Sequence, residues 1–140
     1  MAIAGKLTLE VVTPDRSLVT EDVDEVQVPG ADGYFGILPG HAPLLSSLKV
    51  GELWYRVGSQ THYLAIAFGF VEVLPNRVTV LAQIAERAAE IDVSRAEAAK
   101  ARAETRIAGP RADMDFERAR IAMMKSLVRL QVASRTRTRV

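Results

Sequence analysis

A change of hydrophobic period near residue 86 constrains the fold of this chain more than any other feature. Before it, short runs rich in β-branched and aromatic residues recur about every 8–12 residues between Gly, Pro and Asn, as in β-sandwiches and barrels. After it, Ile91 to Ala108 contains no Gly or Pro and is dominated by strong helix formers. We therefore expect an α+β fold, with an N-terminal antiparallel β-sandwich over residues 1–86 and a C-terminal two-helix antiparallel hairpin over residues 87–140.

The N-terminal part contains six segments with the composition of half-buried strands. They are Leu7–Val12, Val23–Val28, Glu52–Val57, His62–Ala67, Phe70–Leu74 and Val78–Ala82. The third and fourth flank residues 58–61, and the last two flank residues 75–77, so both pairs are predicted to form β-hairpins. We therefore expect these strands to pair in an antiparallel sandwich or a flattened barrel.

The first helix is predicted to begin at Asp92 or at Ser94, which has Glu97 three residues later as in a capping box. It should end at Gly109 and Pro110. Its inner face is largely alanine, namely Ala96, Ala99 and Ala103. Because such a face buries little area, we expect a modestly packed hairpin that can open without unfolding the sandwich.

The second helix is predicted to begin near Asp113 or Asp115 and to run to about Ala133. Its large apolar residues fall near one face at spacings of seven, four and three. They are Phe116, Met123, Leu127 and Leu130. Residues 135–139 alternate Arg and Thr without an apolar face, so they are predicted to fray.

Charge is distributed unevenly along the chain, although the formal net charge is only +1. Residues 1–85 carry five Lys or Arg against nine Asp or Glu, a net charge of −4. Residues 86–140 carry thirteen against eight, a net charge of +5. The opposite signs suggest that the two parts meet different partners.

Composition excludes several classes of protein. The chain has no cysteine, so it forms neither disulfides nor thiolate metal sites, which fits a reducing cytosol. Its longest apolar run, Leu64 to Val71, is eight residues, far short of the ~20 that span a bilayer. The first residues have no signal or transit composition, so we expect the chain to stay in the compartment where it is made.

Residues for catalysis are also missing from the sequence. Neither His41, in a Gly/Pro-rich run, nor His62, in a predicted strand, has a second His or Cys at zinc-ligand spacing, so structural roles are favoured for both. Phosphate-binding loops, nucleophile elbows and dinucleotide fingerprints are absent. We expect a non-catalytic protein that requires no metal or cofactor.

The basic arm leaves two other functions open, a nucleic-acid-binding protein and a nucleotide-sensing adaptor. Its arginines provide the positive charge that phosphate contact needs. Its one aromatic residue is Phe116, and acidic residues alternate with basic ones along the first helix, so a solvated helix face is favoured over nucleic-acid binding.

The most specific run in the sequence is Gly33 to Leu44, in which three glycines and two prolines lie among apolar residues. Such a run predicts a stiff, shaped loop that can dock on another protein. With residues 12–15 before it and 69–73 after it, the run resembles the epsilon subunit of the rotary ATP synthase. The resemblance continues through residues 80–83 and 91–96 to the end of the second predicted helix.

The resemblance implies a rotor subunit in the central stalk of the enzyme. Its sandwich would bind the gamma subunit and the c-ring at the cytoplasmic face of the membrane, with membrane contact only through the complex and no nucleic acid. The hairpin would lie folded or extend toward the alpha and beta subunits and restrain ATP hydrolysis. The implied contacts with gamma and the c-ring are Tyr34, Phe35, Gly36, Ile37, Leu38, Pro39, Gly40 and His41.

Tyr34 stands where the family often has an acidic residue, so the resemblance implies docking there without a salt bridge. In the second helix, basic residues are implied to meet acidic groups of the beta subunits through long-range attraction. These residues are Arg118, Arg120, Lys125 and Arg129. The alternative for each is an ordinary solvated position.

Some members of the family bind ATP as a regulatory ligand through an I-D-x-x-R-A motif, which is present from Ile91 to Ala96. By position, the nucleotide would be surrounded by Glu86, Asp92, Arg95, Ala96, Arg102, Arg118 and Arg129. Arginines from two helices can hold phosphates by paired hydrogen bonds, whereas Lys125 stands in place of an expected arginine. The alternative is that Asp92 caps the helix and Arg95 pairs with nearby acids.

Overall fold

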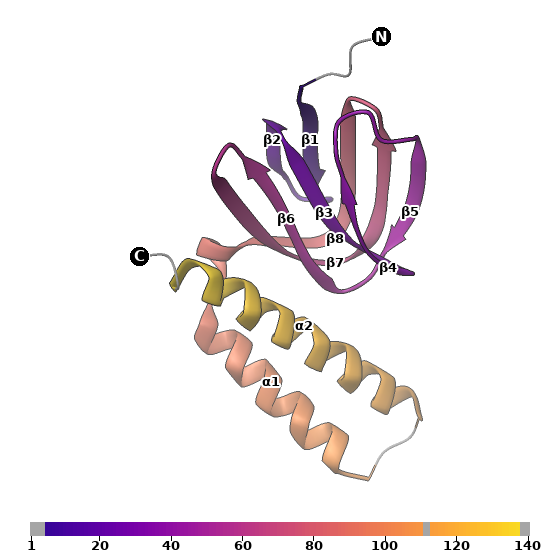
Figure 1. Cartoon of the computed structure of the whole chain (residues 1–140). Helices are drawn as coiled ribbons and strands as arrows, with labels where there is room; N and C mark the ends of the chain where they lie inside the picture. The colour runs from indigo at the N-terminus through magenta and orange to yellow at the C-terminus, as the bar shows by residue number, and fades with distance from the viewer. Residues whose placement is uncertain (1–4, 111–112, 138–140) are drawn as a thin grey trace. The chain divides into compact units, whose positions relative to one another are not determined.

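The structure, a computed structural model, describes residues 5–110 and 113–137 (Figure 1). Its internal contacts divide the chain into two units, residues 1–87 and 88–140. The first is a β-sandwich and the second consists of two long helices packed together, so the predicted fold class is confirmed.

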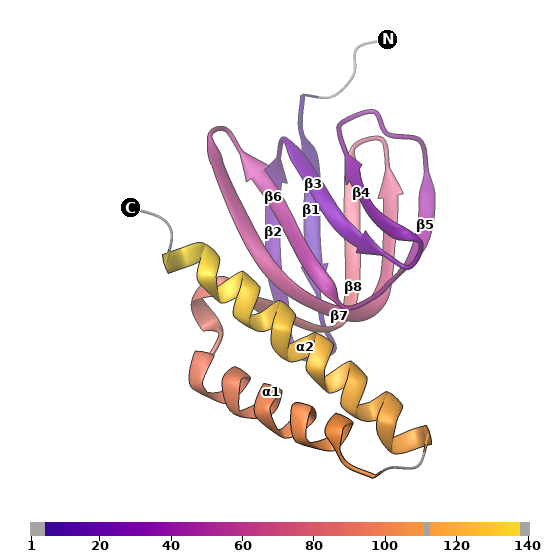
Figure 2. The ribbon, with the colours of Figure 1, turned by 60° about the horizontal axis from the view of Figure 1, so that its bottom comes forward.

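The sandwich unit is built from eight strands, most of which pair with their neighbours as hairpins. They are β1 (Leu7–Val12), β2 (Ser17–Val23), β3 (Glu25–Gly30), β4 (Gly33–Ile37), β5 (Leu44–Leu48), β6 (Gly51–Val57), β7 (Gln60–Leu74) and β8 (Arg77–Arg87). Both predicted hairpins are present, β6 with β7 and β7 with β8. In Figure 2, β3, β4 and β6 lie in front of β1, β2 and β8, which form the second layer of the sandwich.

The long strand β7 connects the two layers. Its first half pairs with β6, its second half pairs with β5, and β8 follows it along most of its length. The change of partner falls at Phe68 and Gly69, whose φ angles are 62° and 128°. The sequence pattern predicted two separate strands here, because Phe68 and Gly69 interrupt the alternation of apolar residues. In the structure the backbone continues through them as one strand.

One pairing departs from the antiparallel prediction. β1 lies parallel to β8, with Thr8 opposite Arg77 and Val12 opposite Leu81. The other strand pairs that the structure describes are antiparallel. The parallel contact joins strands that are far apart in the sequence, so no local turn signal could reveal it.

Other parts of the strand prediction also need correction. The segment Val23–Val28 is divided between β2 and β3, and neither β2 nor β5 was predicted. β2 carries several exposed polar residues and β5 reads Leu-Leu-Ser-Ser-Leu, so neither shows clean alternation. The run Gly33–Leu44 was predicted as a loop, yet its first five residues form β4, which lies at the edge of the sheet and pairs with β3.

The core of the sandwich is filled by alternate aliphatic residues of the strands. In β1, for example, Leu7, Leu9 and Val11 are fully buried while the residues between them are partly exposed. This period of two places one row of side chains inside and the other row outside. The outward rows therefore carry whatever the sandwich presents to other proteins.

The helical unit consists of a short 3-10 turn η1 (Ala88–Glu90), α1 (Val93–Ala108) and α2 (Asp113–Arg137). Of the two predicted N-caps for α1, Asp92 is the one used, because its Oδ1 accepts a hydrogen bond from the Arg95 backbone N–H at 3.1 Å. Gly109 caps the other end. The helix α2 continues through residues 135–137, which had been predicted to fray, and residues 138–140 lie outside the described part.

The two helices lie side by side and antiparallel in both views (Figures 1 and 2). Their buried positions include small residues spaced by seven, which we call the seam. The seam consists of Ala96 and Ala103 on α1 and Ala119, Ser126 and Ala133 on α2. The alanine face predicted for α1 is thus largely confirmed, but on α2 Leu127 is 45% exposed, contrary to prediction, because the narrow seam admits small side chains.

Candidate interaction surfaces

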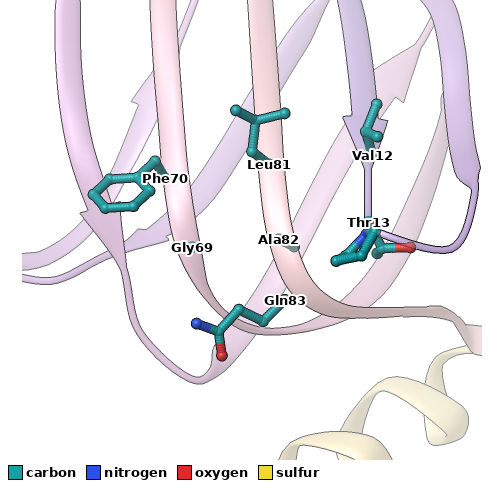
Figure 3. Close-up of a pocket in the computed structure, with 8 residues that line it drawn as sticks. Val12, Thr13, Gly69, Phe70, Leu81, Ala82 and Gln83 are labelled. Atoms are coloured by element: carbon teal, nitrogen blue, oxygen red, sulfur yellow. The ribbon is translucent and has the colours of Figure 1, made fainter.

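Apolar side chains form a continuous group on the outward face of the layer that contains β1, β8 and the second half of β7. Phe70 lies directly opposite Leu81, which in turn lies opposite Val12, so three strands contribute to one row (Figure 3). Phe70 and Leu81 are each 54% exposed. Leu45 on β5, in the adjoining row, is 71% exposed. We call Val12, Leu45, Phe70 and Leu81 the outer band.

A groove of about 340 Å³ runs beside the outer band. Its walls include Phe70, Leu81, Pro14 and Gln83, and Gly69 forms part of its floor. A Cβ at Gly69 would lie 2.0 Å from the Leu81 carbonyl oxygen, so only glycine allows β7 to approach β8 this closely. The groove is apolar enough to accept an aliphatic or aromatic side chain from a partner.

The sequence did not identify the outer band as a contact surface. The signal was present, since Phe70 to Val73 and Val78 to Leu81 carry apolar residues in both phases of a strand. One buried face needs only every second residue to be apolar, so the excess marks a second, exposed apolar face.

The segment from Tyr34 to His41, implied as the contact with gamma and the c-ring, extends along β4 and the turn that follows it. Phe35 packs against the core and Ile37 is fully buried, so these two residues face inward. Tyr34, Gly36 and Leu38 alternate with them on the outward side. Only part of the implied segment is therefore available to a partner.

The two ends of this segment lie in different surroundings. At one end, the Tyr34 hydroxyl accepts a hydrogen bond from the Glu52 backbone N–H at 3.1 Å, and the Lys49 ammonium lies 5.4 Å from the centre of the Tyr34 ring. At the other end, Gly40 donates its N–H to the Pro75 carbonyl at 2.7 Å and His41 donates its N–H to the Leu38 carbonyl at 3.1 Å. These bonds fix the shape of the turn.

The two histidines lie in different surroundings. His62 stacks on the buried Tyr55, with ring centroids 4.9 Å apart. Burial raises the pKa of the Tyr55 hydroxyl. In His41, Nδ1 lies 2.7 Å from the Ala42 carbonyl oxygen. Among residues 5–110 and 113–137, no three His, Cys, Asp or Glu side chains gather as a metal would need.

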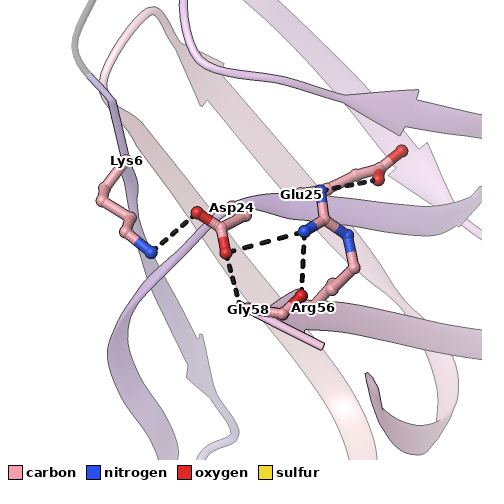
Figure 4. Close-up of polar contacts among 5 residues, drawn as sticks. All are labelled: Lys6, Asp24, Glu25, Arg56 and Gly58. Atoms are coloured by element: carbon pink, nitrogen blue, oxygen red, sulfur yellow. Dashed lines mark hydrogen bonds and ion pairs between the residues drawn. The ribbon is translucent and has the colours of Figure 1, made fainter. Parts of the chain in front are cut away.

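A polar cluster joins the start of β3 to the turn between β6 and β7 (Figure 4). Asp24 accepts a hydrogen bond from the Gly58 N–H at 2.6 Å and pairs with Lys6 at 2.7 Å. Arg56 lies 3.6 Å from Asp24 and 3.4 Å from Glu25. The hydrogen bond from Lys6, followed by that from Gly58, lowers the pKa of the Asp24 carboxyl. The cluster fixes a corner of the sandwich and has no feature of a catalytic site.

The residues implied for ATP binding are divided between the two units. Glu86 lies on β8 in the sandwich unit, and the others lie on the helical unit. Ala96 is completely buried in the seam, so its side chain is closed to a ligand. Asp92 is engaged as the N-cap of α1, as the structural alternative predicted, whereas Arg95 and Arg102 are exposed.

Arg118 lies at the opposite end of the hairpin from Asp92. It lines a cavity of about 490 Å³ together with Thr105 and Arg106, near the turn between the helices. At 1.5 Å per residue, Thr105 is about 20 Å along α1 from Asp92. Because the helices are antiparallel, Arg129 lies about 16 Å back along α2 toward the start of α1. Arg129, rather than Arg118, is therefore near the level of Asp92 and Arg95.

The four basic residues of α2 implied to contact the beta subunits also differ in their surroundings. Arg120 binds Glu117 on the same helix through two hydrogen bonds of 3.1 Å, which lower the pKa of Glu117 and raise that of Arg120. Arg118 is exposed at the turn, and Lys125 and Arg129 are partly buried.

Within the described residues, no helix is both long enough and apolar enough to cross a bilayer.

Comparison with known families separates the two units at the same region of the chain. Residues 6–88 match the model described as "ATP synthase, Delta/Epsilon chain, beta-sandwich domain". Residues 89–134 match the model described as "ATP synthase, Delta/Epsilon chain, long alpha-helix domain". The two models together cover nearly the whole chain.

Individual relatives also align with nearly the full length of this chain. The chain is 50% identical over 134 residues to the ATP synthase epsilon chain of Syntrophobacter fumaroxidans, covering 96% of this chain and 100% of that one. It is 46% identical over 138 residues to the epsilon chain of Citrifermentans bemidjiense, covering 98% and 100%.

Solved structures confirm the fold at lower identity. A chain of the Euglena gracilis mitochondrial ATP synthase (OSCP/F1/c-ring) aligns with a TM-score of 0.83 at 23% identity, covering 96% of this chain and 84% of that one. A chain of the Tetrahymena thermophila mitochondrial ATP synthase (central stalk/c-ring) aligns with a TM-score of 0.62 at 14% identity, covering 98% and 100%. With both family models and both curated relatives matching over nearly its full length, the chain belongs to the ATP synthase delta/epsilon chain family, whose epsilon chains are non-catalytic subunits of the central stalk.

Proposed function

We propose that this chain joins the gamma subunit and the c-ring through its sandwich and restrains ATP hydrolysis through its helical hairpin. The observation that carries the first part is the outer band, a group of exposed apolar side chains on a sheet whose inner face is already fully packed. Exposed apolar groups of this kind mark places where another protein covers the surface and removes them from water. We assign it to gamma.

Covering the band provides part of the free energy that such a contact needs. Burying the exposed half of Phe70 or Leu81 contributes about 1–1.5 kcal/mol each, and Leu45 contributes at least as much because more of it is exposed. The groove beside Phe70 adds a place where a partner side chain can be enclosed. Together these features resemble the buried centre of a protein interface.

The experiment exchanges Phe70→Ser and Leu81→Ser together and measures how much gamma subunit co-purifies with the full chain. Loss of the contact is expected, with thermal unfolding unchanged because both side chains face outward. Leu127→Ser is the matched control, since Leu127 is an exposed leucine on the helical unit. Equal recovery of gamma with the double variant and with the control would remove the assignment.

The c-ring contact is assigned to the outward residues of β4 and the turn that follows it, Tyr34, Gly36, Leu38 and His41. β4 is the last strand in the pairing order of the sheet, and the outer band belongs to the other layer, so two partners can bind at the same time. Through this contact the chain would be held at the cytoplasmic face of the membrane.

The inhibitory role is assigned to the hairpin, which carries most of the positive charge of the chain. Deleting residues 88–140 should raise ATP hydrolysis by the assembled enzyme, and unchanged hydrolysis would remove this role. We expect the arginines of α2 to contribute unequally to inhibition. Arg118→Gln should relieve inhibition more than Arg120→Gln, because Arg120 is already bound to Glu117.

ATP as a regulatory ligand is assigned to the end of the hairpin that contains Asp92, Arg95 and Arg129. Titration of the full chain with ATP tests this, and the absence of saturable binding at millimolar concentration would exclude the site. Arg129→Gln should weaken binding. Arg118→Gln is the control, because it lies about 16 Å away along α2 and should leave the affinity unchanged.

A further inference from the structure

Arg87 is the last residue of β8, and the division of the chain into two units falls directly after it. Its backbone still pairs with Leu64 of β7. Its side chain donates a hydrogen bond from Nη2 to the Leu18 carbonyl of β2, 69 positions earlier in the sequence. The last residue of a strand is ordinarily the first to open, whereas this one is bound to two other strands.

The same guanidinium also reaches the other layer of the sandwich. Tyr55 belongs to β6, is 2% exposed and stacks on His62. Burial raises the pKa of its hydroxyl, and a hydrogen bond from Arg87 opposes that rise. A planar guanidinium has five N–H donors, so it can serve two acceptors at once. Arg87 therefore joins β2 and β8 of one layer to β6 of the other, at the point where the chain leaves the sandwich.

The residues that follow Arg87 are bound within the helical unit. The turn η1 contacts α2, and the Ile91 N–H donates a hydrogen bond to the Ala88 carbonyl at 3.4 Å. Asp92 then caps α1. The contacts of the sandwich thus end at Arg87 and those of the helical unit begin at η1. Rotations about the backbone bonds between them set the direction in which the hairpin leaves the sandwich.

We propose that Arg87 is a positioning residue for the hairpin: its bonds to Leu18 and Tyr55 keep the end of β8 on the sandwich and so limit the directions that the helical unit can take. This inference rests on the proposed inhibitory role of the hairpin and names a residue that regulates it. A hairpin that starts from a fixed point samples fewer directions, so its effective concentration at the site where it inhibits is higher.

The test measures distances between the two units in the full chain. Because the chain has no cysteine, spin labels can be attached to one introduced pair, Ser59→Cys in the turn between β6 and β7 and Ala98→Cys on α1, both at exposed positions. Arg87→Gln should broaden the distribution of distances between the labels, because the end of β8 can then open and each freed residue lengthens the connection by about 3.3 Å. Hydrogen exchange of residues 84–87 should become about tenfold faster.

Arg77→Gln is the matched control. Arg77 lies at the other end of the same strand and also binds through its side chain, 3.0 Å from Glu10, so its loss should leave both readouts at wild-type values. Arg87→Lys should restore part of the wild-type behaviour, because an ammonium keeps the charge and can bond one of the two acceptors. A purely structural role would lower stability without broadening the distances among folded molecules. An unchanged distance distribution for Arg87→Gln would overturn the proposal.

If Arg87→Gln does not fold, Tyr55→Phe takes its place, since it removes the hydroxyl and keeps the ring that stacks on His62. Broader distances with that variant support the proposal, and wild-type distances overturn it. In the assembled enzyme, Arg87→Gln should raise ATP hydrolysis toward the level reached when residues 88–140 are deleted. If the deletion leaves hydrolysis unchanged, the inhibitory role fails. If the deletion raises hydrolysis and Arg87→Gln does not, only the role of Arg87 fails.

Discussion

Gly69→Ala should destabilise the sandwich strongly, because two separate costs fall on one methyl group. The residue has a φ of +128°, which an L residue adopts at a cost of roughly 1–3 kcal/mol. The new Cβ would also lie 2.0 Å from the Leu81 carbonyl oxygen and 2.9 Å from the Ala82 Cα. Moving the β8 backbone away adds about 1–3 kcal/mol, as overpacking does in cores.

The sum, about 2–6 kcal/mol, is a large part of the roughly 5–15 kcal/mol that stabilises an ordinary domain. For a unit of this size it corresponds to a fall in the unfolding temperature of about 10 °C or more. The single tryptophan, Trp54, lies on β6, so its fluorescence reports unfolding of the sandwich separately from the helices.

Gly36→Ala is the matched control, since it adds the same methyl group to a strand glycine with an ordinary φ and open space. It should leave the unfolding temperature unchanged or raise it slightly. A fall of less than about 3 °C for Gly69→Ala, with the control unchanged, would refute the argument that the close approach of β7 to β8 requires glycine.

Two further predictions concern local electrostatics and capping. Asp92→Ala should cost about 1 kcal/mol of hairpin stability, seen as faster hydrogen exchange in the first turn of α1. Asp92→Asn should cost much less, because asparagine also caps helices. Equal losses for the two variants would contradict the capping role of Asp92. Because Lys6 and Gly58 lower the pKa of Asp24, the stability that its carboxylate contributes is present above about pH 4 and is lost as the pH falls toward the folded-state pKa. Urea unfolding of Asp24→Asn should therefore show a shallower loss of stability below pH 4 than wild type, and an identical acid limb would contradict it.

Much of the helical unit could be predicted from sequence, because helix signals are local. The cap at Asp92, the end at Gly109 and the alanine face of α1 each depend on residues within a few positions of one another. The prediction that Leu127 lies on the packed face of α2 was wrong. Which side chains of α2 are buried depends on the other helix, whose small residues leave a narrow seam. Local periodicity cannot show the shape of the opposing surface.

The candidate sites were only partly predictable for the same reason. The run from Gly33 to Leu44 is the most specific in the sequence, but its glycines and prolines predicted a loop where its first five residues form a strand. All the implied ATP residues except Glu86 lie on one helix pair, yet the length of α1 places Asp92 about 20 Å from the end where Arg118 lies. Matching by sequence position named these residues but gave no information on the distances between them.

The sequence by itself determined the division of the chain into a sandwich and a helical pair, because the period of apolar residues changes at a definite point. Only the tertiary structure decided which surfaces those parts present. Val12, Phe70 and Leu81 come from three strands, and they form one row because β1 lies parallel to β8 in a particular register. Register is fixed by packing between distant segments, so a surface built across strands exists only once the whole sandwich has formed.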